Sequence, residues 1–176
     1  LFSKQGYDAT AVAEICESAK VSKGAFYYHF SSKQAVFLAL FQDWLSSLDQ
    51  QMDKLQQSDF SVPETLRFMT ELIPHIIATD GDRFRIFLEF WNQASHDPAM
   101  WQITIEPYQR YQVFFAKLIA HGIREGSIED VDQQIVARIV VALALGVLLQ
   151  GMVEPVGVDW EEVSQQGIDL LLDGIT

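Results

Sequence analysis

The stretch from Ile139 to Leu149, IVVALALGVLL, would be apolar on every side if it formed a helix. Such a helix must be covered all round by other apolar groups. The run is eleven residues long and lies between Arg138 and Gln150, whereas a helix needs about 18 apolar residues to cross a membrane. We therefore expect a buried helix, either inside one chain or at an interface between two copies, and no membrane span.

Helical spacing also governs the rest of the chain. In residues 83–95, for example, apolar side chains recur at i, i+3, i+4 and i+7 from Phe84 onward, which is typical of one buried helix face. Glycine and proline fall between such stretches, and no alternating strand of useful length is visible. The sequence therefore predicts an all-α fold of about nine helices. These are residues 1–5 (the end of a truncated first helix), 11–18, 23–28, 32–57, 83–95, 98–125, 132–153 and 159–174, and a helix from 62 that kinks or ends near Ile73, before Pro74.

Residues able to cap a helix N-terminus precede four of these helices. Thr10 and Ser22 stand before the second and third helices, and Ser31 and Ser61 stand before the fourth and fifth. Each of the last two serines is followed three residues later by Gln or Glu, which is the pattern of a capping box. These positions predict where the chain enters each helix.

Charge is divided unevenly along the chain. The sequence carries 12 Lys+Arg against 24 Asp+Glu, a net charge of −12. Residues 1–42 hold four lysines and three acids, a net of +1, so the remainder carries −13. A polyanion such as DNA could therefore be bound only by the first part of the chain.

Cations and aromatic residues of this first part gather in one stretch, VSKGAFYYHFSSK, from Val21 to Lys33. The stretch belongs to a short helix, a tight turn and a second short helix that span Thr10 to Tyr28, which are the proportions of a helix-turn-helix. Such a unit lays its second helix in the major groove of DNA, N-terminal residues first. The alternative interpretation is an aromatic-rich structural corner with two solvated lysines.

The second helix would bring its first residues to the base edges. Lys23 can reach a guanine edge or a phosphate, Gly24 lets the backbone approach DNA closely, and Ala25 can offer its methyl group to a thymine. The candidate donors to phosphates are Tyr27, Tyr28, His29 and, at the N-terminus of the next helix, Lys33.

The segment GYDATAVAEICESAKVSKGAFYYHFSSKQAVFLAL, residues 6–40, closely resembles the DNA-binding domain of TetR-family transcriptional regulators. The resemblance covers about the first 45 residues, and Lys20 stands where many relatives have glycine in the turn. It is carried, in one fixed register, by Gly6-Tyr7, Thr10, Ile15, Val21-Ser22-Lys23-Gly24, Phe26-Tyr27, His29-Phe30 and Lys33. It implies that the operator is contacted by Thr10, Ser22, Lys23, Gly24, Ala25, Tyr27, Tyr28, His29 and Lys33.

The remaining residues, 46–176, resemble the family's C-terminal half only in layout, with several helices around a cavity and two closing helices. The resemblance implies an apolar effector pocket in this second domain, after a DNA-binding domain in residues 1–45. Aromatic and aliphatic walls with a few polar groups suit such a pocket, although each candidate could be ordinary core. Glu71 and Glu106 could meet a cationic ligand or be solvated surface carboxylates. The candidate lining residues are Phe68, Leu72, Phe87, Trp91, Trp101, Tyr108, Tyr111 and Phe115.

The apolar run and the last helix together predict a dimer interface. Small residues in the run permit close approach of helices, and the last helix carries an apolar stripe at i, i+3, i+4 and i+7. Two such helices from each chain would form a four-helix interface in a two-fold homodimer, although burial within one chain is the alternative. The expected interface residues are Ile139, Ala142, Leu145, Gly146, Leu149, Ile168, Leu171, Leu172 and Ile175.

Enzymatic function finds little support in the sequence. The four histidines are scattered over four segments, and no Gly-rich phosphate loop or nucleophile elbow is present. We therefore expect no catalytic residues, metal site or cofactor. The one cysteine, Cys16, excludes an internal disulfide and is compatible with a reducing cytoplasm.

These observations predict a cytoplasmic, dimeric, sequence-specific DNA-binding transcriptional regulator. The expected partners are a double-stranded, near-palindromic operator and a small molecule. We expect a repressor that is released by an apolar or amphipathic effector. The alternatives are a TetR-like activator and a hydrophobic small-molecule binding protein without DNA function, which would leave Val21 to Lys33 unexplained.

Overall fold

The computed structural model describes residues 1–56, 60–79, 81–95 and 98–176, and within these ranges it contains helices and no strand, which confirms the all-α prediction. The predicted end of the fourth helix at Gln57 lies outside the described residues. The helices are α1 (Phe2–Gln5), α2 (Val12–Ala19), α3 (Lys23–His29), α4 (Lys33–Gln56), α5 (Val62–Thr70), α6 (Leu72–Thr79), α7 (Gly81–Ala94), α8 (Pro98–Glu125), α9 (Gln133–Val153) and α10 (Trp160–Leu172).

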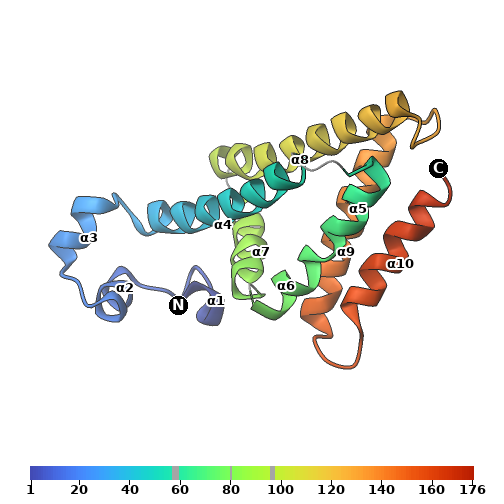
Figure 1. The fold of residues 1–176 in the computed structure, drawn as a ribbon. Coiled ribbons are helices and arrows are strands. Elements are labelled where there is room, and N and C mark those ends of the chain that lie inside the picture. The colour runs from blue at the N-terminus through green and yellow to red at the C-terminus, as the bar shows by residue number, and fades with distance from the viewer. Residues whose placement is uncertain (57–59, 80, 96–97) are drawn as a thin grey trace.

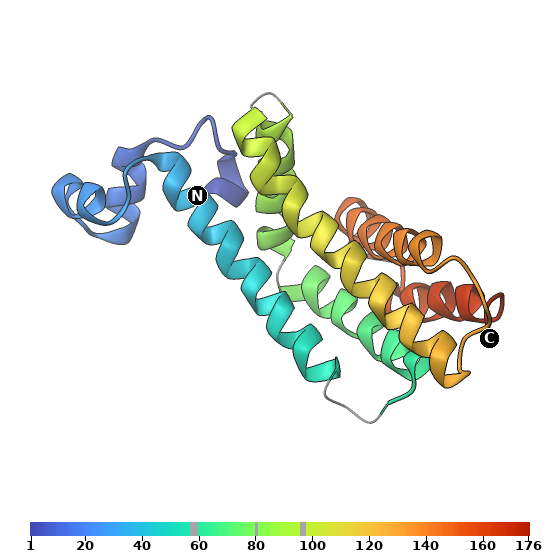
Figure 2. The ribbon, with the colours of Figure 1, turned by 90° about the horizontal axis from the view of Figure 1, so that it is seen from above.

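A small head and a larger helical body make up the molecule. Figure 1 shows α2 and α3 at one end, with α4 leading from α3 into the body. In the body, α8 packs extensively on α9, and α10 packs on α5 and α9. The view from above shows α4 and α8 running in similar directions along the body (Figure 2). The predicted domain boundary at residues 45 and 46 falls inside α4, which is one continuous helix.

Two apolar clusters form the core. Near the head, α4 packs on α7 through Phe37, Phe41 and Phe90, and the ring centroids of Phe41 and Phe90 lie 4.5 Å apart. Farther from the head, Ile119 of α8 and Leu172 of α10 are both 0% exposed and belong to the second cluster. The body is therefore held together by ordinary apolar burial from one end to the other.

Helix starts follow the predicted caps with two shifts of one residue. Ser22 caps α3 by accepting a hydrogen bond from the backbone N–H of Ala25 (3.1 Å). The capping box before α5 is also confirmed, because the Glu64 carboxylate accepts from the backbone N–H of Ser61 (2.8 Å). At α4, however, the capping hydroxyl belongs to Ser32 and not to Ser31.

The second shift occurs at α2. Its N-cap is Ala11, whose backbone N–H donates to the Glu14 carboxylate at 2.7 Å. Thr10, the expected cap, instead donates its hydroxyl to the carbonyl of Gly6 at 2.7 Å. The threonine therefore stabilises the turn between α1 and α2, one residue before the helix that it was predicted to cap.

Pro74 divides the predicted fifth helix, although not where expected. α5 ends at Thr70 and α6 begins at Leu72, so the break comes about three residues before Ile73–Pro74. Proline has no N–H to donate to the carbonyl four residues earlier, which is that of Thr70. The chain therefore leaves the helix at the residue whose carbonyl would lack its partner. In α8, by contrast, Pro107 lies inside a continuous helix.

α9 contains the apolar run from Ile139 to Leu149. By length and composition alone it could cross a membrane, but in this fold it packs on α6, α8 and α10. Val140 and Val147 are buried, whereas Ile139 and Leu149 are 45% and 47% exposed. A single chain therefore covers only part of the helix.

Candidate functional site

The turn between α2 and α3 is built on an unusual backbone conformation. Lys20 ends α2 with φ 56° and ψ 41°, and it is the single non-glycine residue with positive φ among the residues that the structure describes. An L-residue in this left-handed region costs about 1–2 kcal/mol. The side chain of Lys20 is exposed, so the turn accepts lysine without a steric conflict in the core. Cys16 of α2 and Phe26 of α3 are buried, and the two helices pack on each other.

α3 presents an outward face of polar and aromatic groups. Lys23, Gly24 and Ala25 of the first turn are exposed, as is His29. Tyr27 and Tyr28 are 56% and 85% exposed, so neither ring serves as core. A Cβ built at Gly24 meets only the Ser22 hydroxyl oxygen, at 3.7 Å. The fold therefore does not require glycine at this position.

Besides Ser22, whose hydroxyl caps α3, two further expected DNA-contacting residues have structural partners. Thr10 is 1% exposed and its hydroxyl is occupied by the Gly6 carbonyl, so it presents no surface to DNA. Lys33 at the start of α4 donates from Nζ to the carbonyl of Tyr7 at 2.6 Å, and its ammonium lies 4.2 Å from the centre of the Tyr7 ring. The lysine thus joins α4 to the segment between α1 and α2, and it is not a free phosphate ligand here.

The same segment is also bound by the body. The backbone N–H of Tyr7 donates to the Glu89 carboxylate of α7 at 3.1 Å, and Gln93 donates to Asp8 at 3.3 Å. Together with Lys33, these contacts form a polar joint between the head and helices α4 and α7. We call these five residues the head joint.

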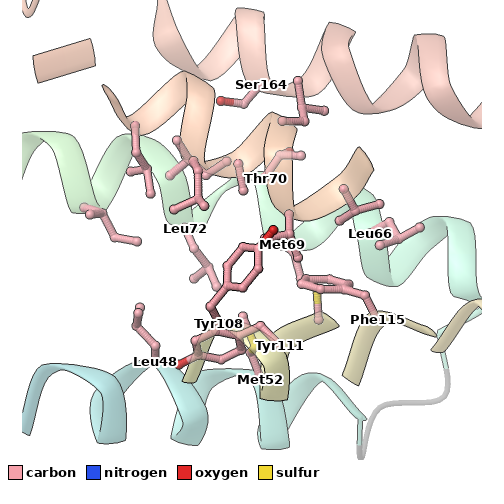
Figure 3. Close-up of a pocket in the computed structure, with 18 of the residues that line it drawn as sticks. Leu48, Met52, Leu66, Met69, Thr70, Leu72, Tyr108, Tyr111, Phe115 and Ser164 are labelled. Carbon is pink, nitrogen blue, oxygen red and sulfur yellow. The ribbon is translucent and has the colours of Figure 1, made fainter. Parts of the chain in front are cut away.

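An internal cavity of about 170 Å³ lies within the body, walled by side chains of α4 through α10. Figure 3 shows the side chains converging from these helices. Of the expected lining residues, the structure brings together Leu72, Phe87, Tyr108, Tyr111 and Phe115. The cavity therefore includes both tyrosines that the sequence predicted to line it.

Three expected lining residues lie elsewhere. Phe68 is 42% exposed and packs against Phe60, which is also exposed, with the two rings tilted. Trp91 packs behind the wall, with ring contacts to Phe87, Trp101 and Tyr108, and neither Trp91 nor Trp101 lines the cavity. Helical periodicity predicts that these aromatic side chains are buried or partly buried. It does not show whether each one lines the cavity, packs behind its wall or lies at the surface.

Sequence reasoning missed the wall formed by α4. Trp44, Leu48 and Met52 line the cavity from this helix, together with Leu45. Trp44, Leu48 and Met52 recur every fourth residue, and this helical stripe is the signal in the sequence that could have found them. Glu71 and Glu106 are exposed and do not line the cavity.

Hydroxyl groups supply the polar atoms of the cavity wall. Thr70 donates to the carbonyl of Arg67 and Ser164 to that of Trp160, each at 2.6 Å. Figure 3 shows the hydroxyl of Tyr108 pointing into the space between the helices. No hydrogen bond joins that hydroxyl to any residue within the described ranges.

Tyr111 connects the cavity to α4. Its hydroxyl donates to Oδ1 of Asp49 at 2.9 Å, and Arg110 donates to Oδ2 of the same carboxylate at 2.8 Å. Burial, and then the negative charge of Asp49, raise the pKa of Tyr111 well above its ordinary value. The phenol therefore stays protonated at neutral pH and keeps donating to α4.

An apolar face of α9 and α10 points away from the body. Ile139 and Leu149 lie on α9, and Leu170 of α10 is 76% exposed. A Cβ built at Gly146 would meet no atom within 4 Å, and Ala142 is exposed. The outward apolar face comprises Ile135, Ile139, Ala142, Gly146, Leu149, Val163 and Leu170.

The predicted stripe on α10 faces the opposite way. Ile168, Leu172 and Ile175 are at most 7% exposed and belong to the chain's own core, with half-buried Leu171 packed against it. Leu145 lines the cavity. The prediction that Ile168, Leu172 and Ile175 form the subunit interface is therefore corrected, because they are already covered by α5, α8 and α9 of the same chain, whereas the assignment of Leu171 to an interface stays a prediction.

Comparison with known proteins agrees with this architecture. Residues 1–40 match the model of bacterial regulatory proteins of the tetR family, and residues 63–173 match the model of the C-terminal part of BetI-type transcriptional repressors. The HTH-type transcriptional repressor DhaR of Mycobacterium sp. (strain GP1) is 27% identical over 88% of this chain and 78% of its own length. The A-factor receptor protein of Streptomyces griseus is 29% identical over 85% of this chain and 50% of its own.

Solved structures share the fold over nearly the whole length. FadR from Bacillus subtilis, in complex with stearoyl-CoA, is 18% identical with a TM-score of 0.83, covering 99% of this chain and 94% of FadR. A regulator from Saccharomonospora viridis, in complex with choline, is 22% identical with a TM-score of 0.85, covering 99% of this chain and 91% of its own. Since the second family model alone matches more than half of the residues, the chain belongs to the TetR family of bacterial regulatory proteins and is a DNA-binding transcriptional regulator.

Proposed function

We propose that this regulator is a homodimeric repressor that binds a near-palindromic operator through α3 and releases it when a small molecule fills the cavity. Residues 1–45 would bind DNA, and residues 46–176 would bind the effector and the second subunit. The observation that carries the proposal is the course of α4, which begins at the head and whose Trp44 and Leu48 form a wall of the cavity. An effector would thus touch the helix that positions the head.

Operator recognition would fall to the exposed face of α3. Lys23, Gly24 and Ala25 stand in its first turn, which would enter the major groove. Tyr27, Tyr28 and His29 would donate to phosphates, which fix the register of the protein on DNA without reading its sequence. Residues 1–42 carry a net charge of +1, whereas the remainder of the chain carries −13. This difference supports binding of DNA, a polyanion, only at the end that contains α3.

Dimerisation would use the outward apolar face of α9 and α10. Large apolar residues scattered singly on a surface need no explanation. Ile139, Leu149 and Leu170, however, are exposed on α9 and α10, two helices that pack on each other. Two copies of this face related by a two-fold axis would cover α9 on the side that one chain leaves open. Two heads would then face two operator half-sites, in the cytoplasm where the chromosome lies.

Release requires that the effector bind the DNA-incompetent arrangement better than the competent one. Each tenfold shift between the two arrangements needs about 1.4 kcal/mol of differential binding. The hydrogen bond from Tyr111 of the cavity wall to Asp49 of α4 supplies a route by which a change in the wall would move α4. The name of the relative DhaR, a repressor, and the bound small molecules of the two solved relatives support this proposal.

Selection of binding sites from random duplex DNA tests the proposal. The wild-type protein should enrich one near-palindromic sequence, and Lys23→Ala should change the preferred bases because a side chain at the groove reads base edges. Lys117→Ala, at an exposed position of α8, is the control and should select the wild-type sequence. Absence of any enriched sequence with the wild-type protein would refute DNA reading by this chain.

A further inference from the structure

The size of the cavity limits the effector to a small molecule. Its volume is about 170 Å³. An engineered cavity of about 150 Å³ lined by Leu, Ile and Phe stays dry and binds benzene. A single ring, or a branched chain of similar bulk, would therefore fill the space without moving the walls.

The lining also limits the charge of the effector. Among the described residues that line the cavity, none is an acid, a lysine, an arginine or a histidine. An ion buried in such a site without an opposite charge would lose its hydration without compensation. Asp49 is hydrogen-bonded to Tyr111 of the wall, and its two oxygens are occupied by Tyr111 and Arg110. These facts favour a neutral occupant.

Hydroxyl groups of the wall specify how polar the occupant can be. Thr70 and Ser164 donate to backbone carbonyls, and Tyr111 donates to Asp49. The hydroxyl of Tyr108 points into the cavity (Figure 3) and forms no hydrogen bond with any residue in the described part of the chain. The hydroxyl of Tyr108 is thus available to a ligand, on the side formed by α8.

We propose that the effector is a small neutral molecule with one hydroxyl or carbonyl group, which pairs with the hydroxyl of Tyr108 while the rest fills the apolar space. The inference rests on the proposed function, since it names the ligand of the same sensor. It sets this chain apart from the two solved relatives, whose ligands are the anionic stearoyl-CoA and the cationic choline. Tyr108 would act as the residue that determines specificity.

Phenol and toluene are suitable probes, because they have nearly the same shape and differ by one hydroxyl group. Their affinities for the full chain are measured by calorimetry, for the wild type and for Tyr108→Phe. A neutral hydrogen bond contributes about 0.5–1.5 kcal/mol net, so the ratio of phenol affinity to toluene affinity should fall about two- to twelvefold in the variant. Toluene itself should bind both proteins with similar affinity.

Tyr111→Phe is the matched control, since it removes the other tyrosine hydroxyl of the wall and should leave the ratio unchanged. An unchanged ratio in Tyr108→Phe, or tighter binding of choline or stearoyl-CoA than of phenol, would overturn the inference. Binding of the wild-type protein to its selected operator is measured in parallel. If the wild-type protein does not bind the operator, the result counts against the proposed function. If it binds the operator but binds neither phenol nor toluene, the result counts against this inference alone.

Discussion

Gly24→Ala separates the contribution of α3 to folding from its proposed contribution to DNA reading. The residue lies in the first turn of α3, and the new Cβ would meet only the Ser22 hydroxyl oxygen at 3.7 Å, an ordinary contact distance. Alanine stabilises a helix interior by up to about 1 kcal/mol relative to glycine. Gly24 lies in the first turn and not in the helix interior, so we expect a smaller gain. The free energy of unfolding should rise by about 0.5 kcal/mol.

Operator binding should change in the opposite direction. In the proposed complex the added methyl group would stand between the backbone of α3 and the edges of the bases. Good base contacts discriminate by about 1–3 kcal/mol each. If the methyl group disrupts one such contact, the affinity for the operator falls about ten- to hundredfold.

Denaturant unfolding and fluorescence anisotropy with labelled duplexes measure the two effects. The salt concentration must be the same for both proteins, because phosphate contacts make DNA affinity depend strongly on salt. A duplex of scrambled sequence is the control, and its weak binding should change little. Unchanged operator affinity in a variant of increased stability would refute the reasoning, since α3 would then not approach the bases through its first turn.

Four further outcomes are expected. Lys20→Gly should raise the free energy of unfolding by about 0.5–1 kcal/mol, because it relieves the left-handed backbone at the cost of glycine entropy; Lys20→Ala keeps the Cβ and should show no such gain in denaturant melts. Ile139→Arg should give a folded monomer in sedimentation, because the residue is half exposed in one chain. The control Val113→Arg on α8 should stay dimeric, and a dimeric Ile139→Arg would place the interface elsewhere. Tyr111→Phe should bind the effector but lose severalfold in effector-induced operator release, because the link to Asp49 is removed; full release would exclude that link as the route. Hydrogen bonds from Ser61 hold the pKa of Glu64 below its ordinary value of 4.5, so this carboxylate stabilises the fold above about pH 4.5 and loses that effect as the pH falls through the lower folded pKa. Acid titration of unfolding should therefore be less steep for Glu64→Gln than for the wild type, and identical slopes would contradict the assignment.

Local patterns predicted the helices of the head well. A short helix, a turn and a capped second helix leave little freedom in residues 10–28, so α2 and α3 lie where expected. The start of α4 was displaced by one residue because two adjacent serines can both cap, and only the structure shows that Ser32 does so. Thr10 and Lys33 were expected to contact DNA because the sequence does not show that their polar groups are already occupied. The Gly6 carbonyl, four residues away, accepts from Thr10, and the tertiary fold brings the Tyr7 carbonyl to Lys33.

Periodicity in the body predicted which helix faces are buried but not what covers them. The stripe with Ile168 and Leu172 on α10 is buried as its spacing indicates, but inside the chain. Leu145 was expected at an interface and lines the cavity, whereas Phe68 was expected in the cavity and lies at the surface. An apolar face carries the same spacing in a core, a pocket or an interface, so the choice among them depends on contacts between distant segments.

The cavity also bears on how long the protein survives in a cell. Enclosed empty space in a core lowers stability by about 24 cal/mol per Å³, which for a cavity of about 170 Å³ amounts to at most roughly 4 kcal/mol. That is a large share of the 5–15 kcal/mol by which domains are typically stable. The ligand-free regulator would therefore unfold, and be degraded, more readily than the occupied one. Accumulation of effector would then raise the abundance of the regulator while it empties the operator, and repression would resume quickly once the effector is consumed.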